Sequence, residues 1–230
     1  MRKMEEFMIQ AVIFDMYETL ITHYRSPLYF GAQMAADAGI TEEAFQVIWQ
    51  QTEIARSTGK LMFEDVIENI LQANQCYSKA IYNKIIEKRY AAKRESFRHL
   101  HPEILPMLAQ IKENGLQIGV ISNCFSEETK VIRESVLFPY FDVVFLSYEQ
   151  GLVKPDKEIF YRCLQKLSVK AEECLYVGDG GSQELETAKA LGMRAVQAVW
   201  YLQEGTEQPS GRKPAFRHME TPLAVMQELQ

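Results

Sequence analysis

Four short segments of the sequence carry polar side chains in a pattern that could perform chemistry. Each polar group stands where an apolar, strand-like run ends or where a helix is expected to begin, and open parallel sheets bind their ligands at the carboxyl ends of the strands. Together the segments offer a carboxylate nucleophile, an oxyanion binder, a cation and a metal site. In chain order they are residues 12–20, 120–123, 154–155 and 176–184.

Asp15 stands at the end of the first apolar run, where a carboxylate could cap a helix, accept a structural hydrogen bond or act as a nucleophile. The presence of the other three segments favours the nucleophile. A carboxylate can attack phosphorus or carbon and form a covalent intermediate that water later hydrolyses.

Asp179 and Glu184 are spaced so that a turn after the fourth strand can bring one or both toward Asp15. Like charges about 4 Å apart repel by on the order of 4 kcal/mol at an effective dielectric constant near 20, so a proton or a cation must offset them. A hard divalent cation fits better, because Mg²⁺ prefers oxygen ligands, waters and phosphate oxygens. The other interpretation is that both acids only cap the following helix.

Ser122 closes the second strand, and its hydroxyl can donate a hydrogen bond to a phosphate or carboxylate oxygen. The backbone N–H of Asn123 could add a second bond, although Ser-Asn pairs are also common in turns. Lys154 precedes Pro155 at a helix start, where the helix dipole disfavours a cation. A lysine in that place suggests an anionic partner.

These segments, in this order, resemble the haloacid dehalogenase superfamily, whose members are mostly phosphatases that work through an aspartyl-phosphate. The match runs from residue 12 to about residue 192. The resemblance implies that Asp15 is the nucleophile and that Lys154 pairs with it and with the transferred group. It also implies that Ser122 and Asn123 bind that group and that Thr19 supports the first loop through its hydroxyl.

The same resemblance implies a Mg²⁺ cofactor. Its ligands would be a carboxylate oxygen of Asp15, the main-chain carbonyl of Tyr17 and a carboxylate oxygen of Asp179. Glu184 would bind the metal directly or lie behind a direct ligand.

Tyr17 decides which hydrolase is expected. Most phosphatases of the superfamily have an Asp there that protonates the leaving oxygen, an effect of roughly 10²–10⁴ in rate. Tyrosine, with a reference pKa near 10, is a poor donor at neutral pH. The pattern Asp-x-Tyr-x-Thr-Leu is instead like the 2-haloacid dehalogenases, in which halide leaves without a proton.

The acidic pair Asp179 and Glu184 indicates the opposite, because dehalogenases need no metal, whereas phosphoryl transfer uses one to neutralise developing charge. We therefore favour a Mg²⁺-dependent phosphatase of a small phosphorylated metabolite. Two alternatives stay open. One is a metal-independent dehalogenase of a small organic acid with an ester intermediate on Asp15, and the other is a weakly active scaffold that binds a phosphorylated ligand.

Strand-like and helical patterns alternate along most of the chain, which predicts an α/β fold with a doubly wound, Rossmann-like parallel sheet. Residues 22–98 break the alternation and are expected to form an all-α cap, so the core would comprise residues 1–21 and 99–230. Expected strands are 8–15, 117–122, 143–147, 174–178 and 195–200; expected helices are 27–38, 42–58, 63–75, 79–95, 103–114, 127–135, 157–167 and 182–191, followed by a loop over 203–216 and a last helix from Thr221-Pro222.

Several residues of the expected cap and its linker are weaker candidates. His23, Tyr24 and Arg25 in the linker, and Arg56 and Lys60 in the cap, could contact substrate, but a surface role is at least as well supported. The run of Lys and Arg over 79–98 is expected to be a solvated helix face.

Composition narrows the function classes. The chain has 230 residues and a net charge of -6, so a nucleic-acid backbone is an unsuitable main partner. No stretch approaches the roughly 18 apolar residues of a membrane span, and the first residues do not resemble a signal peptide, so we expect a cytoplasmic protein. The four cysteines are too sparse for a disulfide framework, and Cys124 is expected to be a packed thiol. The oligomeric state cannot be inferred.

Overall fold

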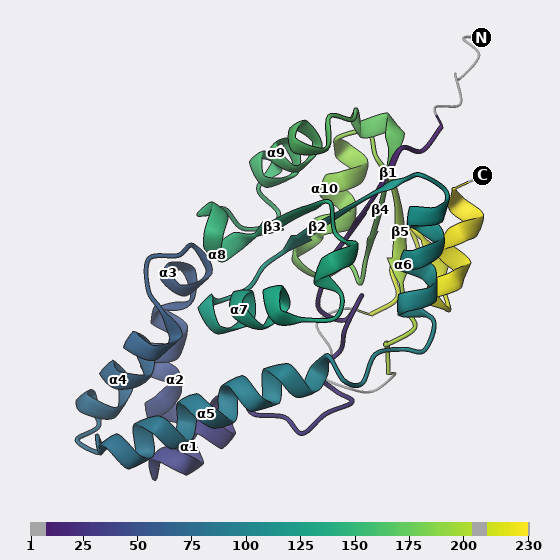
Figure 1. Cartoon of the computed structure of the whole chain (residues 1–230). Coiled ribbons are helices and arrows are strands. Elements are labelled where there is room, and N and C mark those ends of the chain that lie inside the picture. Colours follow the sequence, from purple (N-terminus) through teal and green to yellow (C-terminus); the bar gives the residue numbers. More distant parts are fainter. Residues whose placement is uncertain (1–7, 204–210, 230) are drawn as a thin grey trace.

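The computed structural model describes residues 8–203 and 211–229, in which a six-stranded sheet carries helices on both faces (Figure 1). Neighbouring strands are parallel throughout, in the spatial order β3-β2-β1-β4-β5-β6. The predicted doubly wound α/β fold is therefore confirmed. The strands are β1 (Ala11–Phe14), β2 (Gln117–Ser122), β3 (Val143–Leu146), β4 (Cys174–Gly178), β5 (Arg194–Ala198) and β6 (Arg217–Met219).

The helices fall into two groups, one over residues 31–96 and one from residue 104 onward. The first group is α1 (Gly31–Ala38), α2 (Glu42–Gln51), α3 (Glu53–Ser57), α4 (Phe63–Ala73) and α5 (Lys79–Ser96). The second is α6 (Ile104–Glu113), α7 (Ser126–Glu134), α8 (Ser147–Gln150), α9 (Lys157–Leu167) and α10 (Glu184–Ala190), with short 3₁₀ turns at Phe138–Tyr140, Ala171–Glu173, Gly181–Gln183 and Pro222–Glu228.

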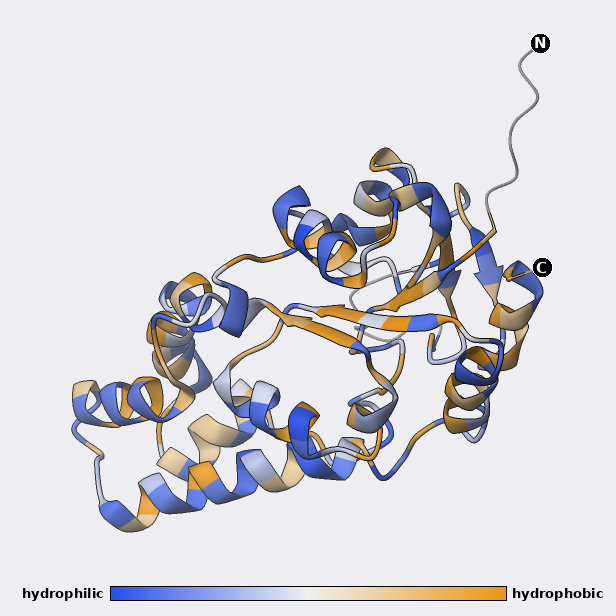
Figure 2. Ribbon diagram, turned by 45° about the horizontal axis from the view of Figure 1, so that its top comes forward, coloured by the Kyte–Doolittle hydropathy of each residue, from blue (hydrophilic) through white to orange (hydrophobic). Residues whose placement is uncertain are grey.

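The sheet separates two apolar cores. Its central strands are largely hydrophobic, coloured orange in Figure 2. Val12 and Phe14 of β1 pack into the core beneath α6 and α7, whereas Ala11 and Ile13 face the core beneath α9 and α10. Successive side chains of a strand point to opposite faces, so a central strand covered on both sides must be apolar throughout. This burial explains the unbroken apolar run that leads to residue 15.

Helices α1 to α5 lie together beside the sheet (Figure 1), and α1, α2, α4 and α5 enclose a third core. Met34, Phe45, Ile67 and Ile85 are among its fully or almost fully buried members. The limits of 22–98 for a cap remain our proposal. None of the helices in the described part of the chain has both the length and the apolar character needed to cross a membrane.

The loop after α3 meets α8 backbone to backbone. Gly59 has φ +74°, and a Cβ at this position would fall 2.3 Å from the carbonyl oxygen of Tyr148. Ser147 fastens α8 in turn, because its hydroxyl accepts from the N–H of Cys124 at 2.9 Å and donates to the Cys124 carbonyl at 3.1 Å. Only glycine therefore permits this approach.

Some element boundaries differ from those predicted. The helix expected over 42–58 is divided at Thr52, whose hydroxyl donates to the Ile48 carbonyl at 2.8 Å and competes with the helical backbone there. The helix expected over 27–38 begins only at Gly31, because the Gln33 side chain accepts from the N–H of Phe30 and fixes the start.

The end of the described chain also differs. The last helix is the 3₁₀ segment Pro222–Glu228 rather than an α-helix, and the strand Arg217–Met219 was not predicted. With only three residues, two of them polar, that strand has no alternating pattern to detect. The loop expected over 203–216 lies partly outside the described residues.

Candidate active site

The sheet topology brings the polar ends of three strands to one edge. Asp15 follows β1, Ser122 ends β2 and Asp179 follows β4, and β1 pairs with both of the other strands. Lys154 comes from the loop before α9, and Glu184 is the first residue of α10. All four sequence segments therefore contribute to one site.

Lys154 lies at the centre of a buried ionic cluster. Its Nζ is 2.6 Å from Oδ1 of Asp15 and 2.5 Å from Oε2 of Glu184. Lys154, Asp15 and Glu184 are all buried. Burial alone would lower the pKa of Lys154, but the two carboxylates together raise it above its ordinary value, so the side chain stays charged.

Glu184 is held by three donors from the chain. Oε2 accepts from Lys154 and from the Tyr176 hydroxyl, the latter at 2.9 Å, and Oε1 accepts from the Gly180 N–H at 3.2 Å. Gly178 makes room for this carboxylate, because a Cβ there would fall 2.0 Å from Oε1. Sequence reasoning missed Tyr176, whose only signal was a hydroxyl inside an otherwise apolar strand.

The acidic residues outnumber their cation. One oxygen from each of Asp15, Asp179 and Glu184 lies within 4.8 Å of the others, so the cluster with Lys154 has an excess of two negative charges when every group is ionised. Burial, and then the charge of Asp15, raises the pKa of Glu184 to about 8, and burial also raises that of Asp15. A divalent cation would offset this excess, so the residues fit the expected Mg²⁺.

The turn that carries Asp179 has an unusual backbone path. Gly180 has φ +95°, and Ser182 and Gln183 have φ +50° and +52°. A non-glycine residue in this region costs on the order of 1–3 kcal/mol and persists only where its surroundings enforce it. Oδ1 of Asp179 accepts from the Gly181 N–H at 2.9 Å, so the carboxylate direction follows the path of the turn.

Two buried hydroxyls among the candidate residues have few partners within the described residues. Ser122 is fully buried, and within the part of the chain that the structure describes its Oγ makes only a long contact of 3.4 Å with the Asn123 carbonyl. The Thr19 hydroxyl is buried and has no hydrogen-bond partner within the described residues. Both are suited to bind an anion that the chain itself does not supply.

Asn123 contributes through its side chain as well as its backbone. Its Oδ1 accepts from the Lys154 N–H at 2.7 Å, and its Nδ2 donates to the Lys154 carbonyl at 3.1 Å. Sequence reasoning considered only its backbone N–H. The reciprocal pair fixes the main chain of the lysine that reaches Asp15.

Tyr17 is enclosed by groups from the linker and from α5. Its ring stacks on His23 with 4.7 Å between centroids, and Nζ of Lys93 lies 5.3 Å from its centroid. Burial and the nearby Glu128 carboxylate raise the pKa of Tyr17 well above its ordinary value. A phenol that holds its proton so tightly is a poor acid at neutral pH.

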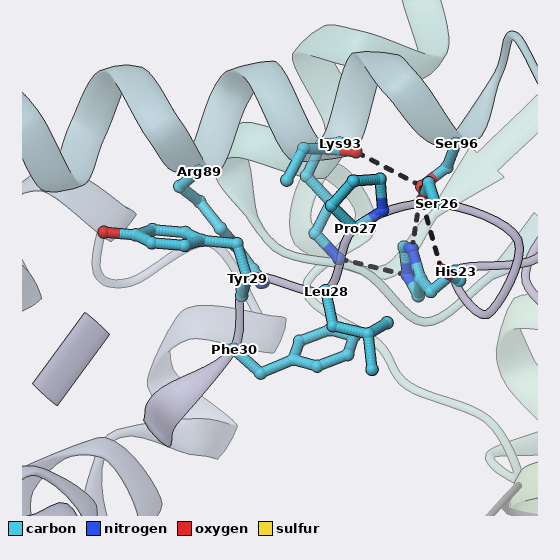
Figure 3. Close-up of a pocket in the computed structure, with 10 residues that line it drawn as sticks. His23, Ser26, Pro27, Leu28, Tyr29, Phe30, Arg89, Lys93 and Ser96 are labelled. Carbon is cyan, nitrogen blue, oxygen red and sulfur yellow. Dashed lines mark hydrogen bonds between the residues drawn. The ribbon is translucent and has the colours of Figure 1, made fainter. Parts of the chain in front are cut away.

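Figure 3 shows a pocket lined by residues of the linker and of α5, among them His23, whose ring stacks on Tyr17. Here Lys93 contacts Nε2 of His23 at 3.0 Å and Oε1 of Glu128 at 2.5 Å. Arg89 pairs with Glu127 of α7 at 3.0 Å. Burial lowers the pKa of Lys93 to about 8.

Arg89 and Lys93 are each only 3% exposed. The prediction of a solvated basic face is therefore wrong for these two residues. Their acidic partners, Glu127 and Glu128, lie on α7, far away in the sequence, and nothing in the local pattern identifies them.

The remaining candidates differ in burial and in the contacts that they make. Arg56 is buried, not exposed, and its guanidinium lies 3.6 Å from the Trp49 ring centroid and 4.1 Å from that of Phe125. Arg25 lies over the Tyr201 ring at 5.0 Å. Tyr24 donates its backbone N–H to the Thr22 hydroxyl at 3.1 Å, and Lys60 is exposed. Cys124 is a buried thiol as expected, and burial raises its pKa to about 12.

Comparison with known proteins identifies the family. Residues 9–192 match the family model of the haloacid dehalogenase-like hydrolases. The chain belongs to this family. The resemblance seen in the sequence is thus confirmed, and the protein is a hydrolase of the haloacid dehalogenase superfamily.

Relatives in this superfamily include both kinds of enzyme considered above. The chain is 30% identical over 203 residues to the glyceraldehyde 3-phosphate phosphatase of Methanocaldococcus jannaschii, which covers 84% of this chain and 86% of that protein. A 2-haloacid dehalogenase of Pseudomonas syringae has a TM-score of 0.66 at 21% identity, covering 96% and 98% of the two chains. An enzyme of the family from Bacteroides thetaiotaomicron, solved with magnesium and inorganic phosphate, has a TM-score of 0.63 at 19% identity, covering 86% and 96%.

Proposed function

We propose that this hydrolase is a Mg²⁺-dependent phosphatase that acts on a small phosphorylated metabolite through an aspartyl-phosphate on Asp15. The excess negative charge of Asp15, Asp179 and Glu184 around Lys154 carries the proposal, because it favours a divalent cation. The phosphatase relative, which spans most of the chain, supports a small phosphate ester as substrate. The oxygen-rich ligand set is also the kind that magnesium prefers.

In the proposed reaction a carboxylate oxygen of Asp15 attacks phosphorus, and the bond from phosphorus to the leaving oxygen breaks. Ser122, the backbone N–H of Asn123 and Lys154 bind the phosphoryl oxygens. Water then attacks the aspartyl-phosphate, releases inorganic phosphate and restores the carboxylate. Lys154 stabilises the attacking carboxylate and the transferred group.

The metal would be held by Asp15, Asp179 and the main-chain carbonyl of Tyr17, and when bound it would neutralise charge that develops on the phosphoryl group. Glu184 has a different role in our proposal. Because its two oxygens already accept from Lys154, Tyr176 and Gly180, it acts as the carboxylate that positions the lysine.

A second candidate function follows from Tyr17. Its tightly held proton suits a reaction whose leaving group needs none, such as halide displacement from a 2-haloacid. Asp15 would then form an ester on carbon, and Asp179 and Glu184 would have no metal to bind.

The deciding experiment is release of p-nitrophenol from its phosphate ester, with Mg²⁺ and with excess chelator, in the native protein and in Asp15→Asn. We expect turnover that needs both the metal and Asp15. Turnover that survives chelation would contradict the proposal, and so would halide release from a 2-haloacid in place of phosphate release. Thermal stabilisation by inorganic phosphate without any turnover would indicate a binding scaffold.

The missing proton donor gives a second test. Without an efficient acid, aryl and acyl phosphates should react much faster than alkyl phosphates, and Tyr17→Asp should raise the alkyl rate by about 10² or more. Tyr17→Phe is the matched control and should leave the ratio of aryl to alkyl rates unchanged. Equal rates on both substrates in the native protein would show that a proton donor is present after all.

A further inference from the structure

Gln197 is a buried amide in β5, beside the strand that carries the Asp179 turn. It is 1% exposed, and both ends of its side chain are engaged. Nε2 donates to the Asp179 carbonyl at 2.7 Å and to the Gly211 carbonyl at 2.8 Å, and Oε1 accepts from the Lys213 N–H at 2.7 Å. One side chain thus joins β5, the turn after β4 and a segment that lies 14 to 16 residues after Gln197 in the sequence.

The segment around Gly211 and Lys213 lies directly against that turn. A Cβ on Gly180 would fall 2.6 Å from Cε of Lys213, so the lysine stem occupies the space that a side chain at position 180 would need. Nζ of Lys213 pairs with Glu186 of α10 at 2.7 Å. The segment therefore spans from the turn to the helix that follows it.

The turn needs such support because its backbone conformation is energetically unfavourable for non-glycine residues. Ser182 and Gln183 both have left-handed conformations that L-residues rarely adopt. The Asp179 carboxylate is oriented from within the turn, by the Gly181 N–H. Any change in the peptide between residues 179 and 180 would therefore redirect the carboxylate.

Only an amide side chain can form all three of the hydrogen bonds that Gln197 makes here. Two carbonyls need donors and one N–H needs an acceptor, which is what a glutamine side chain offers. A glutamate in the ionised form has no donor, and a methionine of similar shape has neither group. Either replacement would leave buried backbone carbonyls unpaired.

We propose that Gln197 is a positioning residue for the metal site. It fixes the Asp179 turn through the Asp179 carbonyl and locks the 211–213 segment over it, so that the Asp179 carboxylate faces Asp15. The inference rests on the proposed function in one respect, namely that Asp179 binds Mg²⁺.

The test compares Mg²⁺ binding by calorimetry in the full-length native protein, in Gln197→Met and in the control Gln165→Met, whose side chain is exposed on α9. Loss of a residue that orients a metal ligand typically weakens binding about 10–100-fold. We expect a Kd for Mg²⁺ at least about tenfold higher in Gln197→Met, no change in Gln165→Met, and recovery of turnover at saturating Mg²⁺. A loss that excess metal does not restore would indicate a merely structural role.

A measurement on the unaltered protein covers the case in which Gln197→Met does not fold. Because coupling between sites is reciprocal, Mg²⁺ should slow amide hydrogen exchange at Lys213 as well as at Gly181. Slowing at Gly181 alone, or an unchanged Kd in Gln197→Met, would overturn the inference and leave the phosphatase proposal intact. If the native protein binds no Mg²⁺, the proposed function fails, and the role of Gln197 in metal binding fails with it.

Discussion

Tyr176→Phe tests the buried cluster by removing a single atom. The Tyr176 hydroxyl donates to Oε2 of Glu184 at 2.9 Å, and both side chains are fully buried, so phenylalanine keeps the packing and removes one of three donors. A hydrogen bond to a charged group contributes about 1.5–3 kcal/mol. In a chain of this size about 2 kcal/mol corresponds to a fall of about 4–8 °C in Tm.

The fall in Tm caused by Tyr176→Phe should depend on pH. The pKa of Glu184 is raised to about 8, so its carboxyl is ionised well above that pH and is largely neutral below it. A bond to a neutral acceptor contributes only about 0.5–1.5 kcal/mol. The fall in Tm should therefore be larger at pH 9 than at pH 6.

The assay is thermal unfolding in excess chelator at both pH values. Tyr161→Phe is the matched control, because Tyr161 is 48% exposed on α9. Equal Tm values for the two variants, or a larger loss at pH 6 than at pH 9, would refute the assignment of Tyr176 as a donor to an ionised Glu184.

Two further predictions concern stability. Arg89→Met leaves Glu127 buried without its cation and should lower the free energy of unfolding, measured by urea titration, by about 3–5 kcal/mol. The control Arg94→Met breaks an exposed ion pair and should lower it by less than about 1 kcal/mol. Similar losses in the two variants would contradict the idea that burial makes the Arg89 pair the more important one. In metal-free protein the free energy of unfolding should fall between pH 6.5 and 8 by up to about 1.4 kcal/mol per pH unit, because the unfolded chain releases the Glu184 proton at lower pH than the folded chain does. Urea titrations at several pH values should show this dependence of the unfolding free energy on pH in the native protein. The dependence should be weaker in Glu184→Gln, which cannot release a proton at this position.

The positions of the main candidate residues could be predicted because a parallel sheet converts local patterns into proximity. Asp15, Ser122 and Asp179 each follow an apolar run, and parallel pairing of β2, β1 and β4 places all three at one edge. Lys154 was detectable because a cation before a helix start is electrostatically unusual.

The partners of those residues could not be predicted in the same way. Tyr176 and Gln197 lie inside strands whose pattern indicates burial but not what a hydroxyl or an amide will contact. Arg89 and Lys93 look like an ordinary charged helix face, and only the packing of α5 against α7 buries them. Such contacts depend on the assembled fold rather than on residues nearby in the sequence.

The contact between Gly59 and Tyr148 limits how this sequence can evolve. A methyl group at position 59 would meet a backbone oxygen at 2.3 Å, and α8 cannot easily retreat because Ser147 binds it to Cys124. A single codon change from glycine to alanine would therefore have to push α3 away from α8, while leaving every residue of the ionic cluster in place. A substitution at position 59 could therefore disturb the packing of α3 against α8 without changing any residue of the ionic cluster.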